Sequence, residues 1–171
     1  PHATEAAHAA SPQQRILNFS YERGLQVSLE ALLKEHAERL DPKITGALIV
    51  IDNRSGHILA RVGSSDYFAP ERAGSIDMTN ALRSPGSALK PFIFALAFES
   101  GVAHPETMVD DRRMRYGIYA PENFDLTYQG QVSARLALQM SLNIPAVALL
   151  NEVAPSRFLA RLKNAGVNII M

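Results

Sequence analysis

The sequence has 171 residues, no cysteine, and 17 Lys and Arg residues balanced by 17 Asp and Glu residues. This length is sufficient for one domain that buries most of its apolar surface, and the lack of cysteine excludes a disulfide framework and thiol catalysis. Since the charges cancel and no basic block occurs, nucleic acid is not an expected partner. No run of about 20 apolar residues is present, so we expect any membrane anchor to lie outside this chain.

The first residues form a short polar segment. Residues 1–14 are small and polar and show no sustained periodicity, so we predict a tail or interdomain linker there, followed by part of one domain over residues 15–171. His2 and His8 lie in this segment, but no third ligand accompanies them, and neither a metal nor another cofactor is expected. The chain begins with Pro1 rather than methionine, which indicates a piece of a longer protein.

The next part of the chain predicts a helix followed by a hairpin. Leucines recur at helical spacing over residues 21–40, which indicates an amphipathic helix that packs on a sheet. The apolar runs 46–52 and 57–62 are separated by a four-residue turn, and such a turn makes them antiparallel strands. Residues 63–83 are rich in Gly, Ser, Asp and Pro and are predicted to form a loop with three solvated acidic residues, Asp66, Glu71 and Asp77.

The second half of the chain is predicted to be helical on either side of a long irregular stretch. Residues 92–98 are apolar on every side, which indicates a buried helix that ends at Gly101. Residues 102–131 are predicted to be irregular, and loops of this length in compact domains are usually functional or disordered. Three further helices are predicted. The first covers residues 134–140 with Ser133 as the cap, the second has Pro145 in its first turn and ends at about Val153, and the third begins at Pro155 and closes at Gly166. Two strands alone form a marginal sheet, so the chain is predicted to be cut within a domain.

Ser87 and Lys90 are the first candidate catalytic pair. They lie three residues apart at the start of the apolar helix, so both side chains are expected on one side of its first turn. A serine hydroxyl needs a base to take its proton, and no Ser-His-Asp arrangement is evident. Burial beside Phe92 and the positive end of the helix dipole would lower the pKa of Lys90 and allow it to be that base. The alternatives are that Ser87 is an N-cap and Lys90 a surface residue with a packed stem.

Ser141 and Asn143 form the second candidate group, at a break between two predicted helices. Such a break can direct a hydroxyl and a carboxamide into a cleft. Ser141 would then relay a proton between Lys90 and a leaving amine, while Asn143 holds a substrate amide carbonyl. Taken alone, the pattern Ser-x-Asn favours an N-cap role for one of the two residues.

The two motifs together resemble those of penicillin-binding proteins and class A β-lactamases. The wider match is to the transpeptidase domain of class A penicillin-binding proteins, most similar to the 1C branch. It extends over about residues 15–171 and rests on residues 47–56, 62–66, 77–92, 119–125 and 133–147. This resemblance implies a mixed α/β (α+β) fold in which an antiparallel sheet has helices on both faces, with only the N-terminal strands and the helical subdomain present. It also implies that Ser87 is the acylated nucleophile, Lys90 its base, and Ser141 and Asn143 the second motif, with Ser87 and Asn143 contacting substrate.

The third motif of that family, Lys-Thr/Ser-Gly on a sheet-edge strand, is absent from this sequence. In the family this strand binds the substrate carboxylate and precedes a second oxyanion donor, so these residues are predicted to lack part of the site. The resemblance implies a periplasmic DD-transpeptidase that cross-links peptidoglycan stem peptides ending in D-Ala-D-Ala and is acylated by β-lactam antibiotics. It further implies a glycosyltransferase domain before residue 1 and an inner-membrane anchor outside this chain.

Two other classes of function are also consistent with these residues. A serine β-lactamase uses the same acylating groups but needs a glutamate that activates water for deacylation, and the residues from 119 to 147 favour the synthase instead. A non-catalytic penicillin-binding sensor would be acylated without turnover, whereas a structural module would not be acylated at all.

Overall fold

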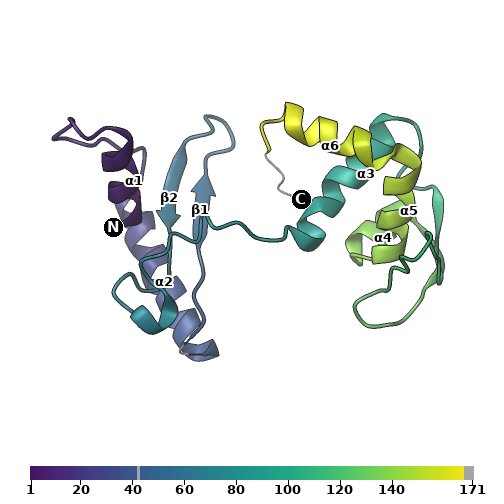
Figure 1. The fold of residues 1–171 in the computed structure, drawn as a ribbon, viewed down its shortest axis with the longest axis horizontal. Helices are drawn as coiled ribbons and strands as arrows, with labels where there is room; N and C mark the ends of the chain where they lie inside the picture. Colours follow the sequence, from purple (N-terminus) through teal and green to yellow (C-terminus); the bar gives the residue numbers. More distant parts are fainter. Residues whose placement is uncertain (42, 168–171) are drawn as a thin grey trace. The chain divides into compact units, whose positions relative to one another are not determined.

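The computed structural model of the protein describes residues 1–41 and 43–167. It divides into two compact units, which we call unit 1 (residues 1–83) and unit 2 (the described residues from Ser84 on). Figure 1 labels the helices and strands of each unit. Both units combine helices with short antiparallel strands, which confirms the mixed α/β class. No helix in the described ranges is long and apolar enough to cross a bilayer.

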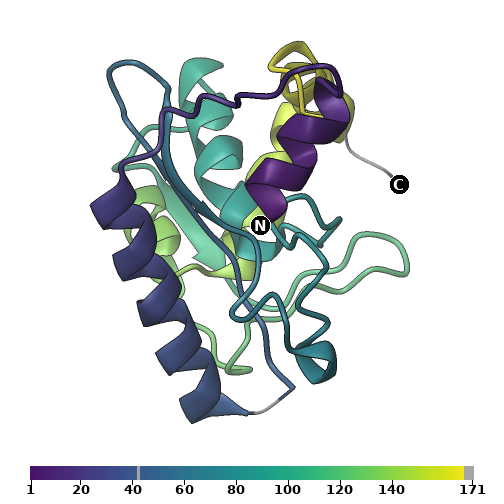
Figure 2. The same ribbon diagram turned by 90° about the vertical axis from the view of Figure 1, so that its left-hand side faces the viewer.

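Unit 1 is a β-hairpin with two helices on one face. Helix α1 is His2–Ala10 and helix α2 is Arg23–Leu40, and Figure 2 shows both helices in front of the hairpin. Strands β1 (Leu48–Ile51) and β2 (Ile58–Val62) pair antiparallel, with a register irregularity between Val50 and Ile51. The predicted helix over residues 21–40 and the predicted hairpin are both confirmed. A single 3₁₀ turn, η1 (Pro70–Arg72), lies in the predicted loop.

Helix α1 corrects the expectation of an irregular segment at the N-terminus. His2 is buried, and its Nε2 donates a hydrogen bond to the Gly74 carbonyl at 2.9 Å. The His2 ring also meets the ring of Tyr67 edge to face, with 5.0 Å between centroids. Alanines dominate this stretch, and alanine has the highest intrinsic helix propensity. Helical propensity without an apolar stripe therefore explains why periodicity alone missed the helix.

Unit 2 contains four helices and a second small sheet. Its first elements are the 3₁₀ turn η2 (Gly86–Leu89) and helix α3 (Lys90–Glu99). Strands β3 (Met108–Asp111) and β4 (Gly130–Ser133) pair antiparallel, with Met108 opposite Ser133 and Asp111 opposite Gly130. The remaining helices are α4 (Ala134–Gln139), α5 (Asn143–Val153) and α6 (Pro155–Asn164). The expectation that residues 102–131 are irregular was therefore wrong at both ends of that stretch.

Three predicted ends of the unit 2 helices are confirmed, at Ser133, Gly101 and Gly166. The Ser133 hydroxyl accepts a hydrogen bond from the Leu136 amide at 3.2 Å and caps α4. Gly101 has φ +71° just after α3, and Gly166 has φ +82° just after α6. A glycine adopts this left-handed conformation without the steric cost that a Cβ imposes, so it is the usual residue after a helix.

Helix α3 forms the centre of the unit 2 core. Phe94 and Ala97 are fully buried, and they belong to one cluster with buried residues of α4, α5 and α6. Phe92, by contrast, is 58% exposed, so the prediction that every side of this helix is buried was wrong at that position. The core places the first residue of α3, Lys90, against the corner between α4 and α5.

Candidate active site

Ser87 and Lys90 lie on consecutive helical turns at the entrance to the core. Ser87 belongs to the 3₁₀ turn η2, and Lys90 is the first residue of α3. The side chain of Ser87 is exposed and caps neither helix, so the N-cap alternative for Ser87 is not observed. Gly86, with φ +50°, provides the tight turn before the serine, where a residue with a Cβ would be strained.

Lys90 is buried and hydrogen-bonded inside unit 2. The residue is only 7% exposed, which contradicts the alternative of a surface lysine. The ammonium nitrogen donates to the Ser141 carbonyl, lies 3.1 Å from Ser141 Oγ, and lies 2.6 Å from Asn143 Oδ1. Burial lowers the pKa of Lys90, because an apolar environment disfavours the charged form. A lysine in this state is suited to accept a proton.

The corner between α4 and α5 presents Ser141 and Asn143 to this lysine. Ser141 has φ +55°, a conformation that is uncommon for a residue other than glycine and that often occurs at functional sites. Leu142 is the N-cap residue of α5, and no side chain caps that helix. The expected break is therefore present, and the N-cap alternative for Ser141 and Asn143 is not observed.

A buried polar network behind the corner holds Asn143 in place. The Asn143 amide donates to Asn123 Oδ1 at 2.8 Å. The Asn123 side-chain nitrogen in turn donates to both carboxylate oxygens of Asp111, at 2.8 and 3.0 Å, and to the Thr127 carbonyl at 2.9 Å. Asp111 is fully buried and Asn123 is 4% exposed. A buried carboxylate is tolerated when its oxygens are hydrogen-bonded in this way.

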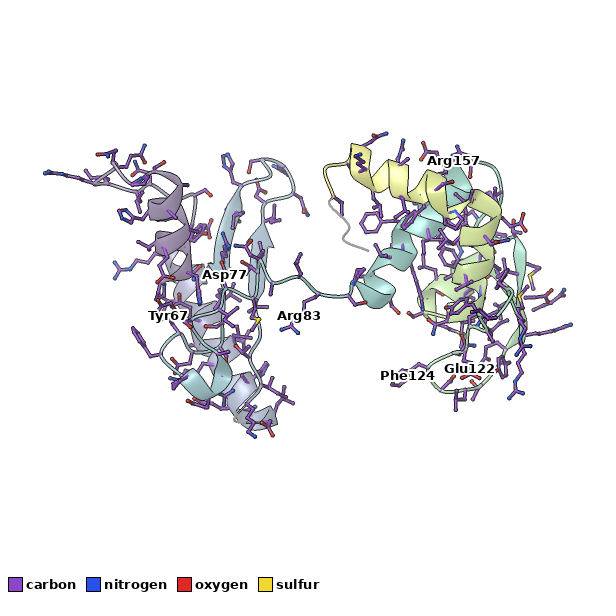
Figure 3. The ribbon with its side chains drawn as sticks, in the orientation of Figure 1. Tyr67, Asp77, Arg83, Glu122, Phe124 and Arg157 are labelled. Atoms are coloured by element: carbon purple, nitrogen blue, oxygen red, sulfur yellow. The ribbon has the colours of Figure 1, made fainter. Side chains whose placement is uncertain are left out.

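Glu122 provides a second connection between the same loop and Asn143. The Asn143 side-chain nitrogen donates to the Glu122 carbonyl at 2.7 Å, and Figure 3 labels Glu122 on the loop between β3 and β4. Because Nδ2 donates to Glu122, Oδ1 of Asn143 is directed toward Lys90. The orientation of this carboxamide is thus fixed at its nitrogen by Glu122 and at its oxygen by Lys90.

Sequence reasoning missed Asp111, Asn123 and Glu122 as parts of the site. All three lie in the stretch that was predicted to be irregular. The available signal was the position of Asp111, which lies two residues after Val109 and on the same, less exposed side of β3. An aspartate at a buried strand position calls for a hydrogen-bonding partner, and Asn123 is that partner.

The structure brings three of the four predicted residues together. Lys90, Ser141 and Asn143 form one hydrogen-bonded cluster. Ser87 lies on the adjoining turn, and within the described residues its hydroxyl is not hydrogen-bonded to Lys90. Catalytic hydrogen bonds are often long without substrate. Within the same ranges, no group of His, Asp or Glu residues is arranged to hold a metal ion.

Sequence comparison identifies relatives of this chain. Residues 46–169 match the family model for the penicillin binding protein transpeptidase domain. The chain is 41% identical over 155 residues to penicillin-binding protein 1C of Escherichia coli (strain K12), covering 91% of this chain and 20% of the relative. It is 32% identical over 130 residues to penicillin-binding protein 1F of Bacillus subtilis (strain 168), covering 75% of this chain and 18% of the relative.

Solved structures share the fold. The PonA1 protein from Mycobacterium tuberculosis in complex with penicillin V aligns with a TM-score of 0.78 at 22% identity, over 96% of this chain and 42% of that one. The transpeptidase domain of Burkholderia pseudomallei penicillin-binding protein 3 aligns with a TM-score of 0.70 at 22% identity, over 85% and 41%. The chain spans about a fifth of the length of these curated relatives. From the family match and the identity to its relatives, the chain belongs to the penicillin-binding protein transpeptidase family.

Proposed function

We propose that this chain is part of a bacterial serine DD-transpeptidase, which cross-links peptidoglycan stem peptides ending in D-Ala-D-Ala through an acyl-enzyme at Ser87. One observation carries the proposal. The buried Lys90, three residues after an exposed serine, is hydrogen-bonded to Ser141 and Asn143 at a strained corner of the same unit. In this proposal, the two motifs that the family uses for acylation act around the Lys90 amine.

In the proposed acylation, the lysine activates the serine. Lys90 takes the proton from Ser87 Oγ, and the oxygen attacks the carbonyl carbon of the D-Ala-D-Ala peptide bond. A tetrahedral intermediate forms, its C–N bond breaks, and the terminal D-alanine leaves as an amine while Ser87 becomes an ester. The lowered pKa of Lys90 favours this role, because a base must be unprotonated at the working pH.

Ser141 and Asn143 have separate roles in this proposal. Ser141 Oγ lies 3.1 Å from the Lys90 nitrogen, so it can take the proton from Lys90 and pass its own proton to the leaving amine. The carboxamide of Asn143 is oriented by the loop between β3 and β4 and holds the amide of the substrate. An acceptor amine then attacks the Ser87 ester, forms the cross-link and releases the serine.

Other parts of the proposed site come from outside these residues. The sequence contains no Lys-Thr/Ser-Gly motif, so we propose that a further segment provides the strand that binds the substrate carboxylate. The E. coli and B. subtilis relatives are named penicillin-binding proteins, which supports β-lactams as ligands that acylate Ser87. We also propose a periplasmic location, a glycosyltransferase domain before residue 1, and a membrane anchor elsewhere in the protein.

The test is acylation by a labelled penicillin. The longest natural chain that carries this sequence is incubated with the penicillin, and intact mass and peptide mapping locate the adduct. We expect one stable adduct on Ser87 that is lost in Ser87→Ala. Ser84→Ala is the matched control, because Ser84 is an exposed serine in the same loop, and this variant should be acylated like the natural protein.

Three results would contradict the proposal. No adduct under any condition would remove Ser87 from the role of nucleophile. An adduct on another serine would do the same. Rapid loss of the adduct, with steady release of hydrolysed penicillin, would identify a β-lactamase rather than a transpeptidase.

A further inference from the structure

The loop between β3 and β4 contains a hollow beside the candidate active site. Its volume is about 350 Å³, and all of its lining residues belong to unit 2. Two arginines, Arg113 and Arg115, contribute to the lining, together with Glu122 and Tyr128. The loop is thus more than a connection between two strands, because it forms a concave surface that bears charge.

Arg113 is held in place by an aromatic ring. Its Nε donates to the Tyr128 hydroxyl at 3.1 Å, and its guanidinium carbon lies 5.5 Å from the centre of the Tyr128 ring. A cation near an aromatic ring is attracted by the ring's electrons, so this contact fixes the guanidinium without neutralising its charge. Within residues 1–41 and 43–167, the terminal N–H groups of Arg113 donate to no other group, so they can bind a ligand.

The hollow has an excess of positive charge. In the described part of the chain, neither Arg113 nor Arg115 takes part in an ion pair, whereas the neighbouring Arg112 lies 3.9 Å from Asp110. Glu122 is the one acidic residue among those lining the hollow. With two arginines and one glutamate among its lining residues, the hollow has a net positive charge that favours an additional anion.

Glu122 joins this hollow to the substrate-binding residue of the proposed site. Glu122 is one of the residues that line the hollow, and its backbone carbonyl accepts the hydrogen bond from Asn143 Nδ2 at 2.7 Å. The next residue, Asn123, is tied to Asp111 and to the Asn143 amide by buried hydrogen bonds. The position of the hollow relative to Asn143 is therefore fixed by several contacts.

We propose that Arg113 and Arg115 bind a side-chain carboxylate of the peptide substrate, at a residue that precedes D-Ala-D-Ala. This inference rests on the proposed function, because it extends the peptide from the scissile bond past Asn143 into the hollow. A planar guanidinium binds a carboxylate with two parallel hydrogen bonds. The site would then distinguish an acidic peptide from its amidated form, which has the same shape but no charge.

The test compares two peptides that differ in one group. Both end in D-Ala-D-Ala, and one carries an acidic side chain where the other carries the corresponding carboxamide. Binding is measured calorimetrically to the longest natural chain with Ser87→Ala, so that no turnover occurs. We expect the acidic peptide to bind about tenfold more tightly, as one to two charge-assisted hydrogen bonds would give.

Matched arginine variants show which residues cause the preference for the acidic peptide. Arg113→Gln and Arg115→Gln should each remove most of the preference for the acidic peptide and leave the binding of the amidated peptide unchanged. Arg112→Gln should keep the preference, since Arg112 does not line the hollow. Because the arginines are exposed, the preference should also shrink as salt is raised from about 0.05 to 0.5 M.

The results that would overturn the carboxylate site differ from those that would overturn the proposed function. Equal binding of the two peptides would overturn the carboxylate site even if penicillin acylates Ser87. Equal affinity for an acidic peptide that lacks D-Ala-D-Ala, or for inorganic phosphate, would show a general anion site and overturn it as well. If penicillin does not acylate Ser87, the proposed function fails. A carboxylate preference lost in Arg113→Gln and Arg115→Gln would still support the binding site.

Discussion

The two units of the chain are stabilised in different ways. Unit 2 has a continuous cluster of buried aliphatic and aromatic residues around α3, including the fully buried Phe94. In the described part of unit 1, the buried apolar residues are only Ala37, Ala60 and Val62. Hydrogen bonds and ion pairs provide many of the other tertiary contacts of unit 1, for example the ion pair between Arg61 and Asp77. The catalytic candidates lie in the unit whose core is apolar, where a charge costs most to bury.

Two lysines illustrate this difference. Lys34 in unit 1 is exposed and pairs with Asp66 at 2.9 Å, and this hydrogen bond raises the pKa of Lys34. Lys90 in unit 2 is buried and faces neutral oxygens, and burial lowers its pKa. The same side chain is therefore kept charged in one unit and brought closer to neutrality in the other.

Replacing Lys90 should give the largest effect. We expect Lys90→Met to slow penicillin acylation of Ser87 by about 10² to 10⁴, the usual contribution of a general base. Lys34→Met is the matched control and should leave the rate unchanged. The measurement is the rate of adduct formation by stopped reaction and mass spectrometry. An unaffected rate in Lys90→Met would remove the lysine from the proposed role.

The pH dependence of acylation follows from the same group. A base works in its unprotonated form, so the rate should rise with pH and level off above the pKa of Lys90. Since burial lowers this pKa, the inflection should fall below about 10.4, the ordinary lysine value. An inflection at the ordinary value would contradict the assignment.

The next largest effect concerns the core of unit 2. Phe94→Ala should lower the free energy of unfolding by about 3 to 5 kcal/mol, because it leaves a cavity where a fully buried ring packed. Phe92→Ala, two residues away and 58% exposed, should change it by less than about 0.5 kcal/mol. Hydrogen exchange in the longest natural chain reports the loss. Similar effects of the two substitutions would contradict the described packing of α3.

The elements with strong periodic signals could be predicted from the sequence. The leucine spacing predicted α2, and the two apolar runs predicted the β1–β2 hairpin, with bounds close to those observed. Capping chemistry located Ser133 and Gly101 correctly. These features depend on neighbours in sequence, so local patterns contain the information.

The second sheet and the polar network depend on contacts that local patterns do not contain. Strand β3 has two aspartates in four residues, and β4 begins with a glycine, so neither resembles a strand by composition. The hydrogen bond between Asn123 and Asp111 joins residues 12 positions apart across a loop. For Ser141 and Asn143, spacing alone favoured a helix cap over the proton relay with Lys90, and the family resemblance was needed to favour the relay.

A smaller effect is expected for the ion pair of unit 1. Burial would raise the pKa of Asp77, but hydrogen bonds from Thr79 and the Arg61 guanidinium outweigh it and lower the pKa overall. The stabilisation is therefore present above the ordinary aspartate value of about 3.9 and is lost as the pH falls through the lowered value. Asp77→Asn should lower the free energy of unfolding by about 1 to 3 kcal/mol at neutral pH.

This difference should disappear in acid. Hydrogen exchange of β2 in the natural protein and in Asp77→Asn, followed from neutral pH to below about pH 3, should converge as Asp77 becomes protonated. Asp66→Asn is the control, because Asp66 forms a more exposed pair with Lys34, and its effect should be smaller. A difference between the natural protein and Asp77→Asn that is independent of pH would mean that charge is not what stabilises this contact.

The smallest effects separate two adjacent serines in unit 1. Ser64 and Ser65 are 6% and 5% exposed. The Ser65 hydroxyl lies 3.2 Å from Thr45 Oγ1, whereas Ser64 Oγ has no hydrogen-bond partner among the described residues. We expect Ser65→Ala to lower the free energy of unfolding by about 0.5 to 1.5 kcal/mol. Ser64→Ala breaks no such bond and should be neutral or stabilising by up to about 1 kcal/mol.

Chemical denaturation of Ser64→Ala, of Ser65→Ala and of the variant that carries both substitutions measures this contrast in stability. Thr45→Val provides the reciprocal control, because it removes the partner of the Ser65 hydroxyl. It also removes the acceptor of the Ser65 amide at 3.1 Å, so it should lower stability more than Ser65→Ala does. In the Thr45→Val background, Ser65→Ala should then have little further effect, since the two substitutions remove the same hydrogen bond. Equal losses in Ser64→Ala and Ser65→Ala would indicate that hydrogen bonding does not account for the burial of polar groups in unit 1. The contrast between its polar interior and the apolar core of unit 2 would then need another cause.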